Sequence, residues 1–143
     1  MDYELGFSFE ELEVGMSASF SKTISEWDVY SFAGISGDFN PLHVNEEYAK
    51  QTRFGARIAH GPLTQSLMAS VLGMKLPGLG ALALEFSMRY LKPTYIGDTV
   101  TATATISEKL AEKKWVRLDL LWTNQRGETL CQGSTLVMPP RKG

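Results

Sequence analysis

The chain has 143 residues, of which 43% are hydrophobic, and a formal net charge of -2 at pH 7. This length and composition predict one globular domain, residues 1–143, with a hydrophobic core. The slight acidic balance argues against a nucleic-acid-binding protein, which usually has a basic excess. The single Cys131 excludes an internal disulfide and fits a reducing compartment. Residues 1–15 lack a basic start and a long apolar run, so we expect no signal peptide, no membrane span and a cytoplasmic location.

The first predicted elements are a strand at residues 17–25 and two helix starts. Ser25 has a side chain suited to an N-cap, and Asp28 lies in the first turn that would follow, where acidic side chains are favoured. Asn45 precedes Glu46 in the same pattern, which predicts a second, short helix. The segment between these two helices is therefore held at both ends.

The second half of the chain predicts one apolar helix followed by four strands. The helix covers residues 63–76, and its composition indicates burial nearly all round. The strands are expected at about 81–91, 98–107, 114–123 and 128–137. An antiparallel sheet needs one face covered, and an apolar helix needs a surface to pack on. The sequence thus predicts an α+β fold in which the sheet and the helix bury each other.

A candidate acid/base pair lies in the segment Gly-Asp-Phe-Asn-Pro-Leu-His, where Asp38 and His43 are five residues apart. The intervening Asn40-Pro41 pair is stiff, because proline fixes its own φ and pushes the preceding residue to extended geometry. A general base must be held close to the proton that it takes. We interpret Asp38 and His43 as this pair and Asn40 as their support. The alternative for Asp38 is a purely structural turn residue.

Gly61 and Pro62 lie where the apolar helix is expected to begin. Exposed backbone N–H groups at this positive end of the helix dipole can stabilise an oxyanion, although a plain helix start explains the pair as well. His60 is predicted to bond backbone and shape the turn. Asp38, His43 and His60 contain the residue types of a metal site, but their spacing does not match known motifs, and we expect no metal.

Four cationic side chains are candidates for binding the phosphates of a large anionic ligand: Arg53, Arg57, Arg89 and Lys92. For any one of them, the alternative is a solvated surface charge.

Residues 32–45, together with Ala59-His60-Gly61, resemble the MaoC-like dehydratase family, which includes the (R)-specific enoyl-CoA hydratases. The similarity extends over nearly the whole chain, including Leu76-Pro77-Gly78 and residues 93–98. It implies the hot-dog fold, in which an antiparallel sheet wraps around one long central helix. This agrees with the pattern of elements described above.

The resemblance also implies a function and a set of roles. Asp38 and His43 would add water to a trans-2-enoyl thioester and yield an (R)-3-hydroxyacyl thioester. The Gly61 N–H would polarise the thioester carbonyl, with Asn40 supporting the pair. The implied enzyme is a hydro-lyase of fatty acid metabolism that acts on acyl-CoA, forms a homodimer and needs no cofactor beyond the coenzyme A of its substrate. The motif leaves open the acyl chain, the direction of the reaction and the use of acyl-carrier-protein substrates.

Two other functions are considered. A hot-dog thioesterase would need a carboxylate that activates water at the thioester carbon, and Glu47 and Glu85 are the candidates. A noncatalytic acyl-thioester binding module would keep the pocket without turnover.

Overall fold

The computed structural model describes residues 2–143, and its elements follow in the predicted order. One five-stranded sheet has the strand order β1-β3-β4-β5-β2, and every neighbouring pair is antiparallel. The elements are β1 (Ser17–Thr23), α1 (Glu26–Ser36), α2 (Pro41–Val44), α3 (Glu46–Lys50), α4 (Gly61–Met74), β2 (Leu82–Tyr90), β3 (Thr99–Leu110), β4 (Trp115–Thr123) and β5 (Thr129–Met138).

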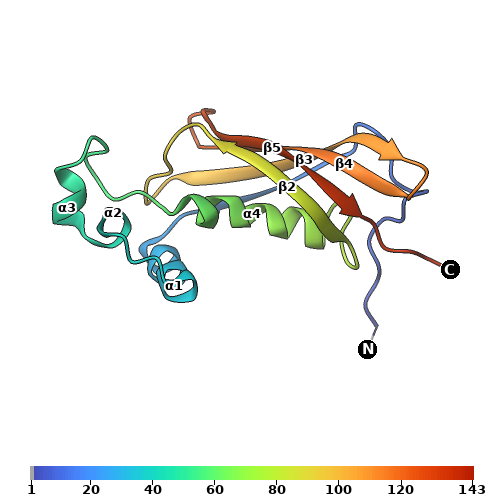
Figure 1. Ribbon diagram of the computed structural model, residues 1–143, viewed down its shortest axis with the longest axis horizontal. Helices are drawn as coiled ribbons and strands as arrows, with labels where there is room; N and C mark the ends of the chain where they lie inside the picture. Colours follow the sequence, from blue (N-terminus) through green and yellow to red (C-terminus); the bar gives the residue numbers. More distant parts are fainter. Residues whose placement is uncertain (1) are drawn as a thin grey trace.

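The core lies between α4 and the inner face of the sheet (Figure 1). Strand β3 shows why, because its side chains alternate between the two faces. Val100, Ala102 and Ile106 are buried, whereas the threonines between them lie on the outer face. On the helix, Met68 and Val71 fill the space opposite these residues. No helix within residues 2–143 is long and apolar enough to cross a membrane.

Helices α1, α2 and α3 form a lobe at one end of the sheet, opposite the end where both chain termini lie (Figure 1). The predicted N-caps are confirmed. The Asp28 N–H donates to Ser25 Oγ over 3.1 Å, and the Asp28 carboxylate accepts from the Ser25 N–H. The Tyr48 N–H donates to Asn45 Oδ1 over 3.0 Å. Such caps satisfy backbone donors that have no partner inside the helix.

Several boundaries differ from the sequence predictions, among them the ends of β1 at Thr23 and of β3 at Leu110. The segment after Asn40 is a single helical turn, α2, rather than a plain loop. Proline is favoured at the first helical position, and the Asn40 side chain caps the turn by accepting from the Leu42 N–H over 3.0 Å. The apolar helix begins at Gly61 with Pro62 in its first turn, as the Gly-Pro pair predicts, and it ends at Met74, two residues before the predicted end.

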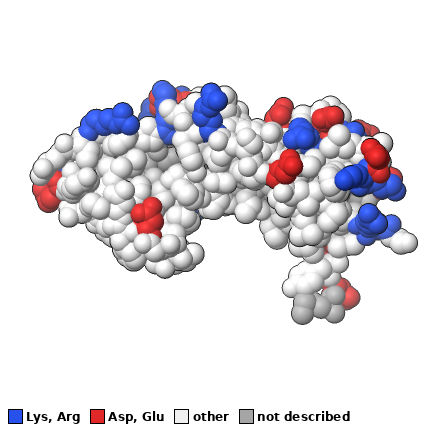
Figure 2. All heavy atoms as spheres, in the orientation of Figure 1, with Lys and Arg blue, Asp and Glu red and all other residues white. Residues whose placement is uncertain are grey.

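The prediction that the apolar helix is buried nearly all round is wrong. Ser66, Ala69 and Met74 are exposed, because the sheet covers only one side of α4. The neighbouring edge strand β2 is exposed along most of its length. Between α4 and β2 runs a groove of about 450 Å³ whose lining includes Ala69 and Phe86. The middle of the face crossed by α4 in Figure 1 carries few charged side chains (Figure 2).

Candidate active site

The lobe brings Asp38 and His43 together. Helix α1 ends at Ser36 and is capped by Gly37, which has a φ of 80° and turns the chain back toward α2. Glycine adopts this left-handed conformation without a steric penalty. Asp38 Oδ2 then lies 3.9 Å from His43 Nε2. The Asp38 side chain is half-exposed and that of His43 is nearly buried. The carboxylate is therefore accessible to a ligand, while the imidazole is held from behind.

Hydrogen bonds fix the orientation of both groups. The Asn40 N–H donates to Asp38 Oδ1 over 3.1 Å, which leaves Oδ2 directed at the imidazole. His43 Nδ1 lies 2.7 Å from the carbonyl oxygen of Ile58. A carbonyl oxygen only accepts, so Nδ1 carries the proton of this bond. In the neutral imidazole, Nε2 is then an unprotonated acceptor that faces Asp38.

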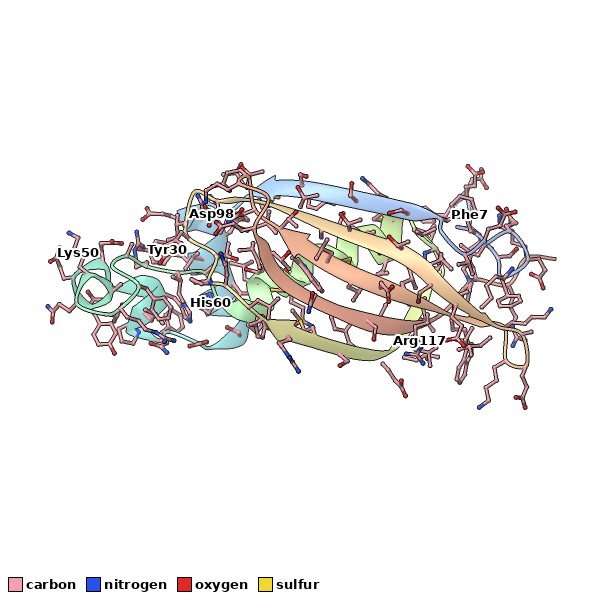
Figure 3. The ribbon with its side chains drawn as sticks, turned by 90° about the horizontal axis from the view of Figure 1, so that it is seen from above. Phe7, Tyr30, Lys50, His60, Asp98 and Arg117 are labelled. Carbon is pink, nitrogen blue, oxygen red and sulfur yellow. The ribbon has the colours of Figure 1, made fainter. Side chains whose placement is uncertain are left out.

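His60 lies where the lobe meets α4 and the sheet (Figure 3). It is fully buried, and its Nε2 donates to the backbone carbonyl of Asp38 over 2.9 Å. Its ring centroid is 3.9 Å from that of His43 and 4.9 Å from that of Phe32. Burial lowers the pKa of His60, because a charged ring there would lose its hydration. His60 thus holds the Asp38 main chain as a neutral imidazole.

One donor atom from each of Asp38, His43 and His60 lies within 4.8 Å of the other two. These are the residue types that bind a transition metal. Nε2 of His60 donates to a backbone carbonyl, and Nδ1 is buried with no hydrogen-bond partner among residues 2–143. A histidine that binds a metal through one ring nitrogen commonly donates the other N–H to a carbonyl, so the cluster has the donor geometry of a metal site as well as that of an acid/base pair. The absence of a metal stays a prediction from the sequence.

Gly61 is the first residue of α4, so its N–H has no acceptor inside the helix. The ring of Tyr90 covers its Cα. A Cβ at Gly61 would lie 2.7 Å from Tyr90 Cε1, closer than such atoms approach in proteins. The Tyr90 hydroxyl in turn donates to Gln65 Oε1 on the next turn of α4 over 3.2 Å. Only glycine allows Tyr90 to pack directly against the start of α4.

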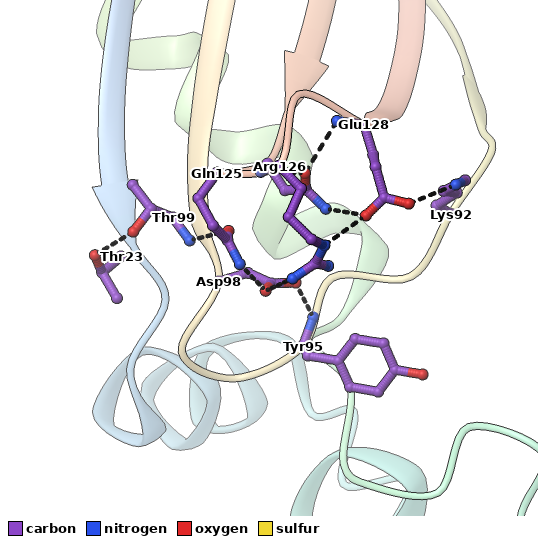
Figure 4. Close-up of polar contacts among 9 residues, drawn as sticks. Thr23, Lys92, Tyr95, Asp98, Thr99, Gln125, Arg126 and Glu128 are labelled. Carbon is purple, nitrogen blue, oxygen red and sulfur yellow. Dashed lines mark hydrogen bonds and ion pairs between the residues drawn. The ribbon is translucent and has the colours of Figure 1, made fainter.

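Two of the four predicted cations lie beside this helix start. Arg53 and Lys92 line a groove of about 430 Å³ together with Gly61 and Tyr90. The Arg53 guanidinium lies over the Phe54 ring, 4.8 Å from its centroid. Lys92 Nζ lies 2.6 Å from the Glu128 carboxylate, at the edge of the polar network in Figure 4.

Hydrogen bonds from Lys92, Asn124 and Arg126 lower the pKa of Glu128 to about 2, so the Lys92 partner is a carboxylate at neutral pH.

The structure does not bring the other two predicted cations to the groove. Arg89 alternates with Met88 and Tyr90 on β2, and it lies on the outer face of the sheet beside Ser87 and Gln132. Arg57 lies inside the lobe, where its guanidinium contacts Glu26, Glu46 and Tyr30. Both arginines were predicted to bind phosphates, because the sequence does not show which face of the sheet Arg89 occupies or which side chains Arg57 contacts.

Two residues of the site were not predicted. Ile58 contributes only its backbone carbonyl, and a backbone role leaves no signature in the side-chain type. Tyr90 packs on Gly61 from a distant strand. The alternation of β2 places Tyr90 on the helix-facing side, but its register against α4 requires the three-dimensional fold.

Comparisons with known proteins show which family the chain is similar to. The family described as MaoC like domain matches residues 10–119. The (R)-specific enoyl-CoA hydratase of Rhodospirillum rubrum is 47% identical, over 94% of this chain and 93% of that protein. The 3-hydroxybutyryl-CoA dehydratase of Methylorubrum extorquens is 40% identical, over 94% and 85%.

Among solved structures, the unliganded R-hydratase PhaJ1 from Pseudomonas aeruginosa superposes with a TM-score of 0.91. It is 35% identical, and the match covers 96% of this chain and 88% of that chain. The predicted fold class, an antiparallel sheet around a long central helix, is confirmed. The chain belongs to the MaoC-like dehydratase family and has its hot-dog fold.

Proposed function

We propose that this protein is an (R)-specific enoyl-CoA hydratase, a hydro-lyase that reversibly adds water to a trans-2-enoyl thioester. The same enzyme run in reverse is a 3-hydroxyacyl-thioester dehydratase. The observation that carries the proposal is the 3.9 Å approach of Asp38 Oδ2 to His43 Nε2 beside the start of α4. The names of the relatives, which match over nearly the full length of both chains, support the same reaction.

The pair moves the protons. A separation of 3.9 Å is too long for a direct hydrogen bond, but a water molecule can contact both groups from the exposed side of Asp38. The pair takes one proton from this water as its oxygen bonds to C3 of the enoyl group. The same proton is then delivered to C2, so that the pair ends in its starting state. His43 can accept at Nε2 because Nδ1 already donates to Ile58.

Gly61 stabilises the charge that develops between these two steps. Attack at C3 moves electrons through C2 to the thioester oxygen and forms an enolate. The Gly61 N–H lies at the positive end of α4 and needs no reorientation to donate to this oxygen. Tyr90 shields the glycine and helps to exclude water from the bond. Asn40 and His60 hold the Asp38 carboxylate and main chain, respectively.

The groove beside Gly61 supports coenzyme A as the carrier of the acyl group. Arg53 and Lys92 lie at this groove and are proposed to meet the phosphates of the carrier. Lys92 must exchange its contact with Glu128 for the ligand. We assign the reaction to cytoplasmic fatty acid metabolism, without a cofactor beyond the coenzyme A of the substrate.

A homodimer is part of the proposal. Strand β2 is an edge strand, and unpaired edges template association with other strands. Its side chains Leu82, Leu84 and Phe86 are exposed, and so is Met74 on the open side of α4. Apolar exposure that is continuous over an edge strand and a helix is typical of an interface. A second copy of the chain would cover the groove between α4 and β2.

The first prediction concerns Asp38→Asn, which keeps the shape of the side chain and removes its basicity. Turnover of crotonyl-CoA, followed by the loss of enoyl-thioester absorbance, is expected to fall by roughly 10² to 10⁴, the usual contribution of a positioned acid/base group. Asp119→Asn on the exposed outer face of β4 is the matched control and should be as active as wild type. Full activity of a folded Asp38→Asn protein would rule out the proposed proton transfer.

The second prediction concerns Gly61→Ala. The new Cβ must displace the Tyr90 ring and tilt the N–H donor, so turnover should fall by about 10² or more, as on loss of an oxyanion donor. Overpacking should also lower the free energy of unfolding, measured in urea, by roughly 1–3 kcal/mol. Gly34→Ala in α1 places its Cβ in open space and should raise this free energy by up to about 1 kcal/mol without loss of turnover. Equal turnover and equal free energies of unfolding in Gly61→Ala and Gly34→Ala would contradict the role of Gly61.

The third prediction concerns the oligomer. Sedimentation should give wild type twice the 15.8 kDa mass of one chain. Leu84→Lys on the edge strand should shift the protein toward the monomer, because it places charge in the proposed interface. Leu121→Lys introduces the same charge on the exposed outer face of the central strand β4, away from the edge, and should leave the mass unchanged. A monomeric wild type would refute the proposed dimer.

No contact within the described residues 2–143 favours the thioesterase alternative. Glu47 is exposed on α3 and pairs with Lys50 over 3.1 Å. Glu85 lies on the exposed edge strand β2, outside the Asp38 and His43 cluster.

A further inference from the structure

Arg57 is the best-connected cation of the lobe. Only 11% of its side chain is exposed. Its Nε donates to Glu46 Oε2 over 2.6 Å, one terminal nitrogen donates to the Tyr30 hydroxyl over 3.0 Å, and the other pairs with Glu26. The hydrogen bonds that Arg57 donates to Glu46 and Glu26 raise its pKa, so the guanidinium is always charged. Its planar fork can hold three partners at once, which the point charge of lysine cannot do equally well.

The partners of Arg57 come from the two helices that flank the acid/base pair. Glu26 and Tyr30 lie on α1, and Asp38 follows the end of that helix. Glu46 lies in the first turn of α3, directly after the short α2 that carries His43. One side chain therefore joins the helix before Asp38 to the helix after His43.

The backbone beside Arg57 continues the connection to the imidazole. The carbonyl of Ile58 accepts from His43 Nδ1, and the Ile58 N–H donates to the carbonyl of Leu42 over 3.3 Å. The next residue, Ala59, donates its N–H to the carbonyl of Thr94 over 2.8 Å, in the loop between β2 and β3. The segment is thus fixed to the loop between β2 and β3 on one side and to the lobe on the other. A shift of Arg57 would move the carbonyl that orients His43.

The charges around Arg57 argue against its predicted role in phosphate binding. Two carboxylates contact one guanidinium, so the cluster as a whole is negative. A phosphate would have to displace one of these carboxylates from a nearly buried site. Arg53, at the rim of the groove beside Gly61, is better placed for a phosphate.

We propose that Arg57 is a positioning residue, which sets the distance and orientation of Asp38 and His43 by clamping α1 and α3 around α2. The inference rests on the proposed hydratase function for its kinetic consequence, but the clamp itself is a property of the free protein. Arg57 touches neither member of the pair and acts through Ile58 and the two helices.

The kinetic test compares Arg57→Gln with Arg57→Lys. A misplacement of about 1 Å in a reacting group can lower the rate by about 10²-fold. We therefore expect kcat for crotonyl-CoA to fall by roughly 10- to 100-fold in Arg57→Gln with little change in KM, and Arg57→Lys to recover part of the loss. Lys50→Gln, which removes an exposed ion pair from α3, is the control and should match wild type. A raised KM with unchanged kcat would assign Arg57 to substrate binding and overturn the proposal.

Milder variants guard against a protein that fails to fold. Glu26→Gln and Glu46→Gln each remove one negative charge that pairs with Arg57 and leave the guanidinium in place. If the clamp acts as a unit, combining either of them with Arg57→Gln should add little to the loss of kcat. Fully additive losses would mean that the three residues act separately, which would contradict the clamp.

A measurement without substrate separates this inference from the proposed function. The His43 Nδ1 proton is hydrogen-bonded to the Ile58 carbonyl oxygen. Nuclear magnetic resonance should show that this proton exchanges slowly with solvent in wild type and in Lys50→Gln. It should exchange faster in Arg57→Gln. If wild type hydrates no enoyl thioester but this proton still responds, the hydratase function fails and the clamp stands. If turnover is present and the proton is indifferent to Arg57→Gln, the clamp fails and the hydratase function stands.

Discussion

A five-residue segment, Arg57 to Gly61, joins the helical lobe, the sheet and the start of α4, and each of its residues has a separate contact. The Arg57 side chain ties α1 to α3, and the Ile58 carbonyl orients the His43 ring. The Ala59 N–H fixes the segment to the loop before β3. The buried neutral ring of His60 holds the Asp38 carbonyl, and Gly61 presents its N–H at the start of α4. The acid/base pair and the oxyanion donor come from different parts of the chain, and this short segment relates their positions.

Much of the fold could be predicted because its signals are local. The Ser25 and Asn45 caps depend on side chains that bond backbone within three residues, and the alternation along β3 depends on the geometry of a single strand. The open side of α4 could not be predicted in this way. Its small apolar residues, such as Ala69, look the same in sequence whether the sheet or a partner covers them. The strand order, with β2 at the edge, decides which side stays open.

The same distinction applies to the site. Asp38 and His43 are close in sequence on either side of a stiff turn, so their approach could be anticipated from one loop. The three partners of Arg57 lie 11, 27 and 31 residues away, and pairing over such distances is set by the packing of the helices in the lobe. Arg89 illustrates the limit most clearly, because an alternation of one residue along β2 separates the outer face from the face that meets Gly61.

The hydrogen bonds of the site require that the two imidazoles hold opposite tautomers. His43 must carry its proton on Nδ1 to donate to Ile58, and His60 must carry its proton on Nε2 to donate to Asp38. The chain contains two histidines, so the spectrum of protein with ¹⁵N-labelled imidazoles has two residues to assign. At mildly alkaline pH we expect His43 in the Nδ1–H tautomer and His60 in the Nε2–H tautomer. Two rings in the same tautomer, or a charged His60 under these conditions, would contradict the geometry from which the acid/base mechanism is derived.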